Sequence, residues 1–439
     1  MKIKMTTGSI LALVLTAVVL VLSIWFVMAM VVPSRNGEIS EILQNTPEAR
    51  TTSVPDAPKT TEKARITPIP APQKTSSKEA DGDGKPLRTE TVSIVCGGTI
   101  AIPKAIRDSA VTPIRTFDFD RIFDGVRPLF EQGDLSMVTL ETLATGSPFK
   151  ADRINAPVSL LDTLAGMGID LVSLATERGL DKGAQALEVT RIALMERGIM
   201  AAGVTEIQGQ PEESLMNVGS LRVAVLAYTY PISEEGLAAS KNHPEQELCM
   251  LDLDRVLEDI RRVKNGGAQA VIVLPHWGTK NRPEMPQEIR KMAIAMAQAG
   301  ADLILGSHPN VVGGTERLKV RRANGLEYET LVCYSLGALM LDGRTLDNCA
   351  SAIVSVPLSY HPEERRVTVG EAKFTPAYIF PDESSGRPRW RVINPLDLEQ
   401  MEKLSEAQQE KAREAVRLVQ ERVLSPGVDG MEQSNETDQ

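Results

Sequence analysis

The sequence predicts an α/β fold with a central sheet that is buried on both faces. From Thr91 onward, continuous apolar runs of strand length alternate with amphipathic helical patterns, which is typical of strands covered by helices. Glycines follow several of the helical patterns, at Gly198, Gly266 and Gly300, where C-cap glycines commonly end helices. The formal net charge of −10 argues against nucleic acid as the main partner.

The N-terminus predicts a membrane anchor. A short tail at residues 1–8 contains Lys2 and Lys4, and an apolar segment follows at residues 9–33. Its apolar run would form a helix about 34 Å long, which is enough to cross the hydrocarbon core of a membrane. The two lysines should stay in the cytoplasm, which places the folded domain outside a cell membrane that the chain crosses once. A cleaved signal peptide is the alternative, although Ala29-Met30 is a poor cleavage site.

Residues 34–90 are predicted to form a disordered linker. The segment is rich in proline, threonine and charged residues and contains no aromatic residue. Such a composition cannot bury enough apolar surface to offset the entropy lost on ordering. The linker would hold the folded domain away from the membrane.

The folded domain is expected at residues 91–380. Its predicted strands are Val92–Cys96, Leu135–Leu140, Asp170–Ala175, Leu221–Tyr228, Ala270–Leu274, Asp302–Leu305 and Thr330–Ser335. Its predicted helices are Phe119–Glu131, Pro157–Gly166, Ala184–Arg197, Leu251–Lys264 and Gln287–Ala299. The runs Ala352–Pro357 and Arg366–Lys373 have the pattern of antiparallel strands. The four cysteines show no C-x-x-C spacing, so buried free thiols are expected, with a disulfide as the alternative.

A C-terminal extension at residues 381–425 is predicted to contain an amphipathic helix. Its start at Ser405 matches a capping box, with Gln408 three residues later. The apolar stripe that follows consists of Ala412, Ala415, Val416, Val419 and Val423. We expect this helix to pack on the domain, and docking to a partner is the alternative. Pro426 and Gly427 should end it, so residues 426–439 are predicted to form a disordered tail.

Two of the four histidines indicate a candidate site. His276 and His308 each directly follow an apolar run of strand character, and the predicted helix Gln287–Ala299 lies between them. In an open α/β sheet, the loops just past the strand ends carry the chemistry. The two histidine loops are therefore expected to lie together at one edge of the sheet.

The motifs around these histidines resemble those of the CapA family, the bacterial capsule and poly-γ-glutamate synthesis proteins. The family patterns HWG, GHHPH and YSLGN correspond here to His276-Trp277-Gly278, Gly306-Ser307-His308-Pro309-Asn310 and Tyr334-Ser335-Leu336-Gly337-Ala338. Upstream family motifs correspond to Leu180-Asp181-Lys182-Gly183 and Thr139-Leu140-Glu141-Thr142. The resemblance runs in order from Thr91 to Ala377. It implies the family's metallophosphatase-like fold, a four-layer α/β/β/α sandwich.

Most positions that correspond to the family's metal ligands carry other side chains in this chain. The aspartate of the family's first motif is Gly98, and the asparagine of NLE is Thr139. The family's Asn-Asn-His triplet is Thr176-Glu177-Arg178, so Arg178 stands where the family has a histidine. The remaining substituted positions are Ser307, Asn310 and Ala338. Because a divalent metal needs several converging oxygen or imidazole ligands, no metal cofactor is expected. If a metal does bind, the resemblance makes Glu141, His276 and His308 its candidate ligands.

The candidate cleft residues are Glu141, Glu177, Arg178, Asp181, His276, Trp277 and His308. The histidines could bind a metal or phosphate, or they could be held by hydrogen bonds at strand ends. Glu141 could bind a metal or cap a turn, and Asp181 is expected to support its loop. Glu177 is expected to pair with Arg178, with a role as substitute ligand as the alternative. Arg178 could bind a carboxylate or phosphate, or it could be an exposed loop residue.

Three functions are compatible with these features, and no catalytic residue is assigned. The first is a degenerate, non-catalytic member of the family that binds or scaffolds an anionic envelope polymer or its synthesis and export proteins. The second is a metal-dependent hydrolase or transferase with a rebuilt minimal site. The third is a structural envelope protein without a ligand. The loss of ligand positions favours the first over the second.

Overall fold

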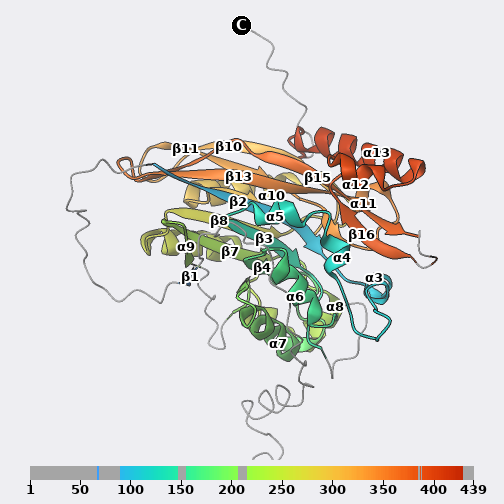
Figure 1. Ribbon diagram of the computed structural model, residues 1–439. Helices are drawn as coiled ribbons and strands as arrows, with labels where there is room; N and C mark the ends of the chain where they lie inside the picture. Colours follow the sequence, from blue (N-terminus) through green and yellow to red (C-terminus); the bar gives the residue numbers. More distant parts are fainter. Residues whose placement is uncertain are drawn as a thin grey trace, which may run out of the picture. The chain divides into compact units, whose positions relative to one another are not determined.

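The computed structural model describes residues 67–68, 89–146, 155–205, 215–383, 386 and 388–428 (Figure 1). All of them lie in one compact unit, Glu62–Gln439. The other unit, Met1–Thr61, lies outside the described residues and includes the predicted tail at 1–8 and the predicted anchor at 9–33. Among the residues that are described, no helix is both long and apolar enough to cross a membrane.

Two β-sheets form the centre of this unit. The seven-stranded sheet has the order β1 (Thr67–Pro68), β6 (Leu215–Val218), β7 (Leu221–Thr229), β8 (Ala270–His276), β9 (Leu303–Leu305), β11 (Glu327–Cys333) and β10 (Thr315–Arg321). The nine-stranded sheet has the order β16 (Arg389–Ile393), β15 (Lys373–Asp382), β13 (Ala350–His361), β2 (Glu90–Ile100), β3 (Leu135–Leu140), β4 (Leu171–Ser173) and β5 (Met200–Ala202). Off this path, β12 (Ala338–Met340) pairs with β2 and β14 (Arg366–Val369) pairs with β13.

An apolar core joins the facing surfaces of the two sheets. Val225 of β7 and Ile272 of β8 belong to this core, together with Ile94 of β2 from the other sheet. The neighbouring residues Ala224 and Val271 belong to a second core on the outer face of the seven-stranded sheet. This division follows from the two-residue period of side chains along a strand.

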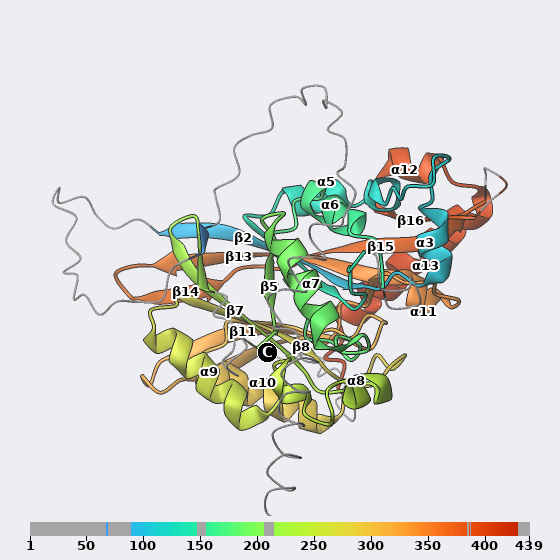
Figure 2. The same cartoon turned by 90° about the horizontal axis from the view of Figure 1, so that it is seen from below.

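Helices cover both outer faces, so the layers follow the α/β/β/α order that the resemblance implied (Figures 1 and 2). The nine-stranded sheet packs against α3 (Lys104–Ser109), α4 (Asp120–Phe123), α5 (Arg127–Glu131), α6 (Ser159–Gly166) and α7 (Gly183–Met195). The seven-stranded sheet packs against α9 (Leu253–Asn265) and α10 (Gln287–Ala299). The other helices of the described residues are α8 (Glu234–Ala239), η1 (Pro244–Gln246), α11 (Leu346–Cys349), α12 (Leu398–Glu402) and α13 (Glu406–Val423).

The prediction of one helix over Phe119–Glu131 is wrong, because two short helices, α4 and α5, flank Gly125. A Cβ at Gly125 would lie 2.6 Å from the carbonyl oxygen of Val392 in β16 and 2.5 Å from Oε1 of Gln400. The chain breaks its helix here so that the backbone can pass close to the sheet edge.

The C-terminal extension belongs to the folded domain rather than to a separate segment. Its strand β16 pairs antiparallel with β15 of the nine-stranded sheet. Helix α13 begins with the predicted capping box at Ser405 and buries Ala412, Ala415 and Val419 in the core next to β13 and β15. Packing on the domain, the first of the two predicted roles of this helix, is therefore confirmed.

Two predictions of disorder are corrected in part. Within the predicted linker, Thr67 and Pro68 form β1 and pair with Asn217 and Met216 of β6. At the other end, the predicted tail begins too early, because Val428 is buried and its backbone pairs with that of Met285. The other residues of the linker up to 88, and residues 429–439, lie outside the described residues.

The cysteines are free, as predicted. Cys96, Cys249 and Cys333 are buried, whereas Cys349 is partly exposed. Burial raises the pKa of the Cys96 thiol to about 12, so this thiol stays protonated and unreactive at neutral pH.

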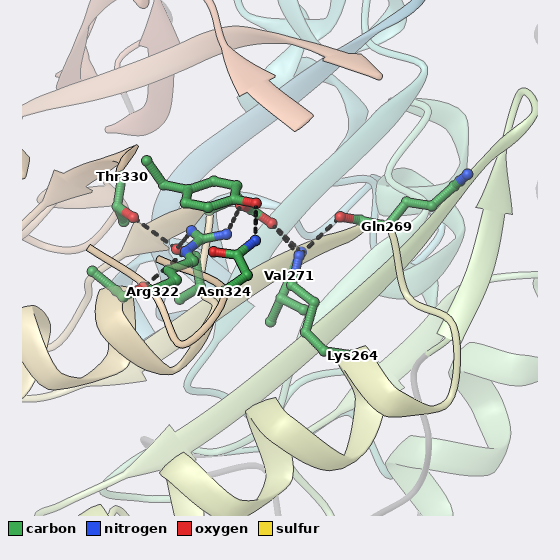
Figure 3. A network of polar contacts seen from close by, with 10 residues as sticks. Lys264, Gln269, Val271, Arg322, Asn324 and Thr330 are labelled. Carbon is green, nitrogen blue, oxygen red and sulfur yellow. Dashed lines mark hydrogen bonds and ion pairs between the residues drawn. The ribbon is translucent and has the colours of Figure 1, made fainter. Parts of the chain in front are cut away.

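A buried ion-pair network holds the amino end of β9, the strand that precedes His308 (Figure 3). The carboxylate of Asp302 accepts hydrogen bonds from Lys264 Nζ at 2.9 Å, from Arg322 Nη1 at 2.9 Å and from the backbone nitrogen of Val271 at 2.9 Å. Arg322 also lies over the ring of Tyr328, with 4.2 Å between its Cζ and the ring centroid. The network thus joins α9, β8 and β9 to the β10–β11 hairpin.

Candidate functional site

The candidate site lies where parallel strands of both sheets end. Glu141 follows β3 of the nine-stranded sheet directly, and Glu177 and Arg178 lie in the loop after β4. His276 is the last residue of β8 in the seven-stranded sheet, and His308 lies in the loop after β9. The parallel pairing of β3 with β4 and of β8 with β9 brings these ends together, as the sequence predicted for the two histidine loops.

The two imidazole rings contact each other. Nε2 of His276 lies 3.1 Å from Nδ1 of His308, and the ring centroids are 4.7 Å apart with 65° between the ring planes. The second ring nitrogen of His276, Nδ1, lies 3.0 Å from Oγ of Ser307. Both nitrogens of His276 therefore already have a hydrogen-bonding partner.

His308 is held in an unusual backbone conformation, with φ at 100°. A non-glycine residue rarely occupies this region, and doing so costs on the order of 1–3 kcal/mol. The next residue, Pro309, is fixed by a 2.8 Å hydrogen bond from the backbone nitrogen of Asn281 to its carbonyl oxygen. The loop geometry thus forces the ring of His308 toward His276.

Both histidines are neutral at physiological pH. Burial lowers the pKa of His276 well below its ordinary value, and the neighbouring His308 and Lys280 act in the same direction. Burial also lowers the pKa of His308 to about 4, although the carboxylate of Glu177 opposes this change. Two neutral imidazoles can share the contact in two ways, because the proton between them can belong to either ring.

Arg178 lies between two buried carboxylates. Its Nη1 donates a hydrogen bond to Oδ2 of Asp181 at 3.0 Å, and its Nε lies 3.4 Å from Oε1 of Glu141. Asp181 also accepts a hydrogen bond from the hydroxyl of Ser233, the residue that caps α8. The expectation that Asp181 supports its loop agrees with these contacts.

Burial shifts the pKa values of Glu141, Asp181 and Arg178 away from their ordinary ranges or opposes their charged forms. It raises the pKa of Glu141, although Lys280 and Arg178 oppose the change, and it raises the pKa of Asp181, although Ser233 and Arg178 oppose it. Burial also disfavours the charge of Arg178, but the surrounding carboxylates hold the pKa of the guanidinium above its ordinary value. Arg178 therefore stays charged, and it compensates carboxylates that burial would otherwise protonate.

The sequence suggested that Glu177 pairs with Arg178, but the structure gives Glu177 a different partner. Its carboxylate forms an ion pair with Lys280, and its Oε2 lies 3.9 Å from Nδ1 of His308. Sequence reasoning missed Lys280 and Ser233 as members of the site, and it treated Ser307 only as a substituted ligand position. The position of Lys280, four residues after His276 in the same loop, was the available signal.

Trp277 does not join the other candidates. Its indole is fully buried in the core on the outer face of the seven-stranded sheet. The indole nitrogen donates a hydrogen bond to the carbonyl oxygen of Tyr334 at 3.0 Å. Because successive strand residues face opposite ways, the residue after His276 points away from the cleft.

The residues present do not fit a divalent metal. Within the described part of the chain, no group of three or more His, Cys, Asp or Glu side chains could hold a metal ion. The nitrogens of His276 are occupied, and the charges of Glu141 and Glu177 are met by Arg178 and Lys280. The carboxylates that resemble family ligands thus have protein cations as partners.

The backbone at Gly98 also excludes a ligand side chain in this conformation. A Cβ at Gly98 would lie 2.1 Å from the carbonyl oxygen of Gly337. That carbonyl accepts a hydrogen bond from the backbone nitrogen of Thr99 at 3.0 Å. An aspartate at position 98 would therefore require the backbone of β2 or of the segment before β12 to move.

Comparisons with known proteins agree with the motifs. The chain is 28% identical over 246 residues to the "PGA biosynthesis protein CapA" of Bacillus subtilis, covering 54% of this chain and 61% of that protein. It is 26% identical over 293 residues to the "Capsule biosynthesis protein CapA" of Bacillus anthracis, covering 64% of this chain and 67% of that protein. The match therefore spans about three fifths of the length of the B. subtilis relative.

Solved structures align with this chain only distantly. The calcineurin-like phosphoesterase YfkN from Bacillus subtilis aligns with a TM-score of 0.39 and 12% identity, over 77% of this chain and 98% of that chain. The NAD nucleotidase NadN from Haemophilus influenzae aligns with a TM-score of 0.39 and 11% identity, over 78% of this chain and 57% of that chain. The sequence profile described as "Bacterial capsule synthesis protein PGA_cap" matches residues 93–342, which is more than half of the 439-residue chain. The chain therefore belongs to the PGA_cap family of bacterial capsule synthesis proteins.

Proposed function

We propose that this chain is a degenerate, non-catalytic member of its family that is anchored in the cell membrane and acts on its outer side. There it binds or scaffolds an anionic envelope polymer of the poly-γ-glutamate type, or the proteins that make and export this polymer. Family membership and the names of the two Bacillus relatives support the link to capsule or PGA biosynthesis. The apolar segment at residues 9–33 supports the anchor.

One observation carries the non-catalytic part of the proposal. The guanidinium of Arg178 pairs with Glu141 and Asp181 at 3.4 and 3.0 Å, at a position where the family motif has a histidine. A divalent cation near these carboxylates would meet the repulsion of a fixed positive charge. The interaction of two such charges a few ångströms apart is worth several kcal/mol at the effective dielectric constant of a protein surface.

The same cations limit how a polymer could bind. The side chains of Arg178 and Lys280 are 36% and 35% exposed, so each can still present part of its charge to a ligand. Because both already pair with carboxylates, we expect weak binding at each repeat and useful affinity only from many repeats together. Titration with poly-γ-glutamate at two salt concentrations, using the wild type and Lys280→Gln, measures this contribution. Equal affinity of the two proteins at low salt would show that Lys280 does not contribute to polymer binding.

A metal-dependent hydrolase or transferase is the alternative, and one observation favours it. His276, His308 and Glu177 lie in series, with contacts of 3.1 Å and 3.9 Å between their side chains. Removal of Lys280 from Glu177 and rotation of His276 would be needed before these groups could converge on an ion. The alternative therefore requires a rearranged site.

Complementation separates the two functions. A strain that lacks this chain would receive the wild type or the double variant His276→Ala/His308→Ala, at matched protein level and with the melting temperature of each protein measured. A non-catalytic scaffold should restore polymer production with either version. Loss of production with a folded double variant at wild-type level would favour the catalytic alternative.

A further inference from the structure

The C-terminal strap, which we define as Arg422–Val428, contacts both loops of the histidine pair. The first histidine loop, residues 277–286, follows His276, and the second histidine loop, residues 306–315, contains His308. The strap lies outside the matched family region, which ends at residue 342. Its contacts with the two loops therefore involve residues that the family motifs do not include.

Three hydrogen bonds join the strap to the second histidine loop. The backbone nitrogen of Thr315 donates to the carbonyl oxygen of Ser425 at 2.9 Å. The hydroxyl of Thr315 donates to the carbonyl oxygen of Val423 at 2.6 Å. Arg422 donates from Nη1 to the carbonyl oxygen of Val312 at 3.2 Å and also forms an ion pair with Asp347.

The strap also holds the end of the first histidine loop. The backbone nitrogen of Met285 donates to the carbonyl oxygen of Gly427 at 2.8 Å. Met285 and Val428 are both buried in the core on the outer face of the seven-stranded sheet. Burial of these two apolar side chains stabilises this end of the strap against the domain.

Contacts between the two loops carry this restraint to the histidines. A Cβ at Gly278 would lie 2.8 Å from Sδ of Met285 and 3.3 Å from Cγ of Pro309, so the three residues are in close contact. Pro309 directly follows His308, and its carbonyl oxygen accepts the hydrogen bond from the backbone nitrogen of Asn281 at 2.8 Å. A shift of Met285 would therefore loosen the packing on both sides of the histidine pair.

We propose that the C-terminal strap is a positioning element for the His276–His308 pair. It fixes the two loops against each other, and this allows His308 to keep its strained backbone conformation and its contact with His276. The inference is independent of the proposed function, because it concerns the shape of the site and is measured by protection of the two rings rather than by polymer binding or production.

The closest approach of strap and loop offers a precise perturbation. A Cβ at Gly314 would lie 2.4 Å from both the backbone nitrogen and the Cα of Gly427. Gly314 does not adopt a positive φ, so Gly314→Ala adds a steric conflict without left-handed backbone strain. Gly266→Ala is the matched control, because its Cβ would meet backbone atoms only at the ordinary distance of 3.4 Å.

The test uses the full-length chain and labelling of histidines by diethyl pyrocarbonate, read residue by residue by mass spectrometry. His243 serves as the internal reference, since its side chain is 61% exposed. We expect His276 and His308 to be strongly protected in the wild type and in Gly266→Ala, and to be labelled at least severalfold faster in Gly314→Ala. The rate at His243 should be the same in all three proteins.

Two further variants keep the test decisive if Gly314→Ala does not fold. A chain ending after Val423 lacks most of the strap, whereas a chain ending after Val428 keeps it and serves as its control. Thr315→Val removes only the hydroxyl contact to the strap. Faster labelling of His308 in the chain ending after Val423, with wild-type rates in the chain ending after Val428, is the expected result. Unchanged protection of both histidines in a folded Gly314→Ala, or in a folded chain ending after Val423, would overturn the proposal.

Discussion

Arg178→Ala should destabilise the folded domain, because it removes the cation that forms an ion pair with each of two buried carboxylates. The side chains of Glu141 and Asp181 are 6% and 0% exposed, and each depends on Arg178 for an ion pair. Removing one partner of a buried ion pair typically costs about 3–5 kcal/mol. Arg178 itself is 36% exposed, so water can replace part of its interaction, and we expect about 3 kcal/mol at neutral pH. Urea denaturation of wild type and variant measures this loss.

The loss should depend on pH in a defined direction. Burial already raises the pKa of Glu141 and Asp181 in the folded chain, and loss of Arg178 should raise both further. An acid with a raised pKa in the folded state binds its proton more tightly there than in the unfolded chain. The deficit of Arg178→Ala should therefore be largest near neutral pH and shrink as pH falls toward the ordinary values of 3.8 and 4.5.

Two comparisons make this prediction refutable. Arg127→Ala is a matched control, since Arg127 is 26% exposed and pairs with Asp120 and Asp124, which are 57% and 54% exposed; it should cost less than about 1 kcal/mol. Adding Glu141→Gln to Arg178→Ala should restore part of the stability, because it removes one uncompensated charge. A deficit no larger than that of Arg127→Ala, or one that grows as pH falls, would refute the reasoning.

Three further predictions concern other parts of the chain. Asp302→Asn should lower the free energy of unfolding by about 3 kcal/mol, because it leaves Lys264 and Arg322 without their carboxylate. Urea denaturation measures this loss, and no measurable change would contradict the role of this network. Burial raises the pKa of Asp302, but the two cations hold it below its ordinary value, so this stabilisation should be lost as pH falls below 3.8. NMR should show no titration of His276 or His308 between about pH 5.5 and 8. The stability that comes from their neutral forms should be lost as pH falls from 6.5 toward about 4. A titration midpoint near 6.5 for either ring would contradict its burial. Protease added to intact spheroplasts should digest the folded domain, and its protection would contradict the predicted topology.

Much of the fold could be predicted because buried parallel strands and amphipathic helices have clear patterns. The bounds of β3 and α10 agree with the predictions from the sequence. Strand β10 was not predicted, because its residues, TERLKVR, alternate charged and apolar side chains at the exposed edge of the sheet. Strand β16 was missed for a related reason, since its burial depends on pairing with β15 and not on an apolar run of its own.

The candidate site was only partly predictable. Spacing after strands and family motifs identified His276, His308, Glu141 and Asp181 as candidate cleft residues, because both indicate strand ends. Charge partners depend on loop conformation, which local pattern does not determine. The sequence thus suggested the adjacent Arg178 as the partner of Glu177. In the folded chain the partner is Lys280, from the loop that follows a strand of the other sheet.

We propose that protein cations and hydrogen-bonded histidines stand in this site where a metal ion would otherwise bind. The most direct test is the metal content of the purified chain after incubation with excess zinc or manganese and removal of unbound ions, together with phosphodiesterase activity. We expect no stoichiometric divalent metal and negligible activity, because both ring nitrogens of His276 already have partners and Arg178 places a positive charge 3.4 Å from Glu141. One tightly bound ion per chain that is lost in His276→Ala would contradict the claim.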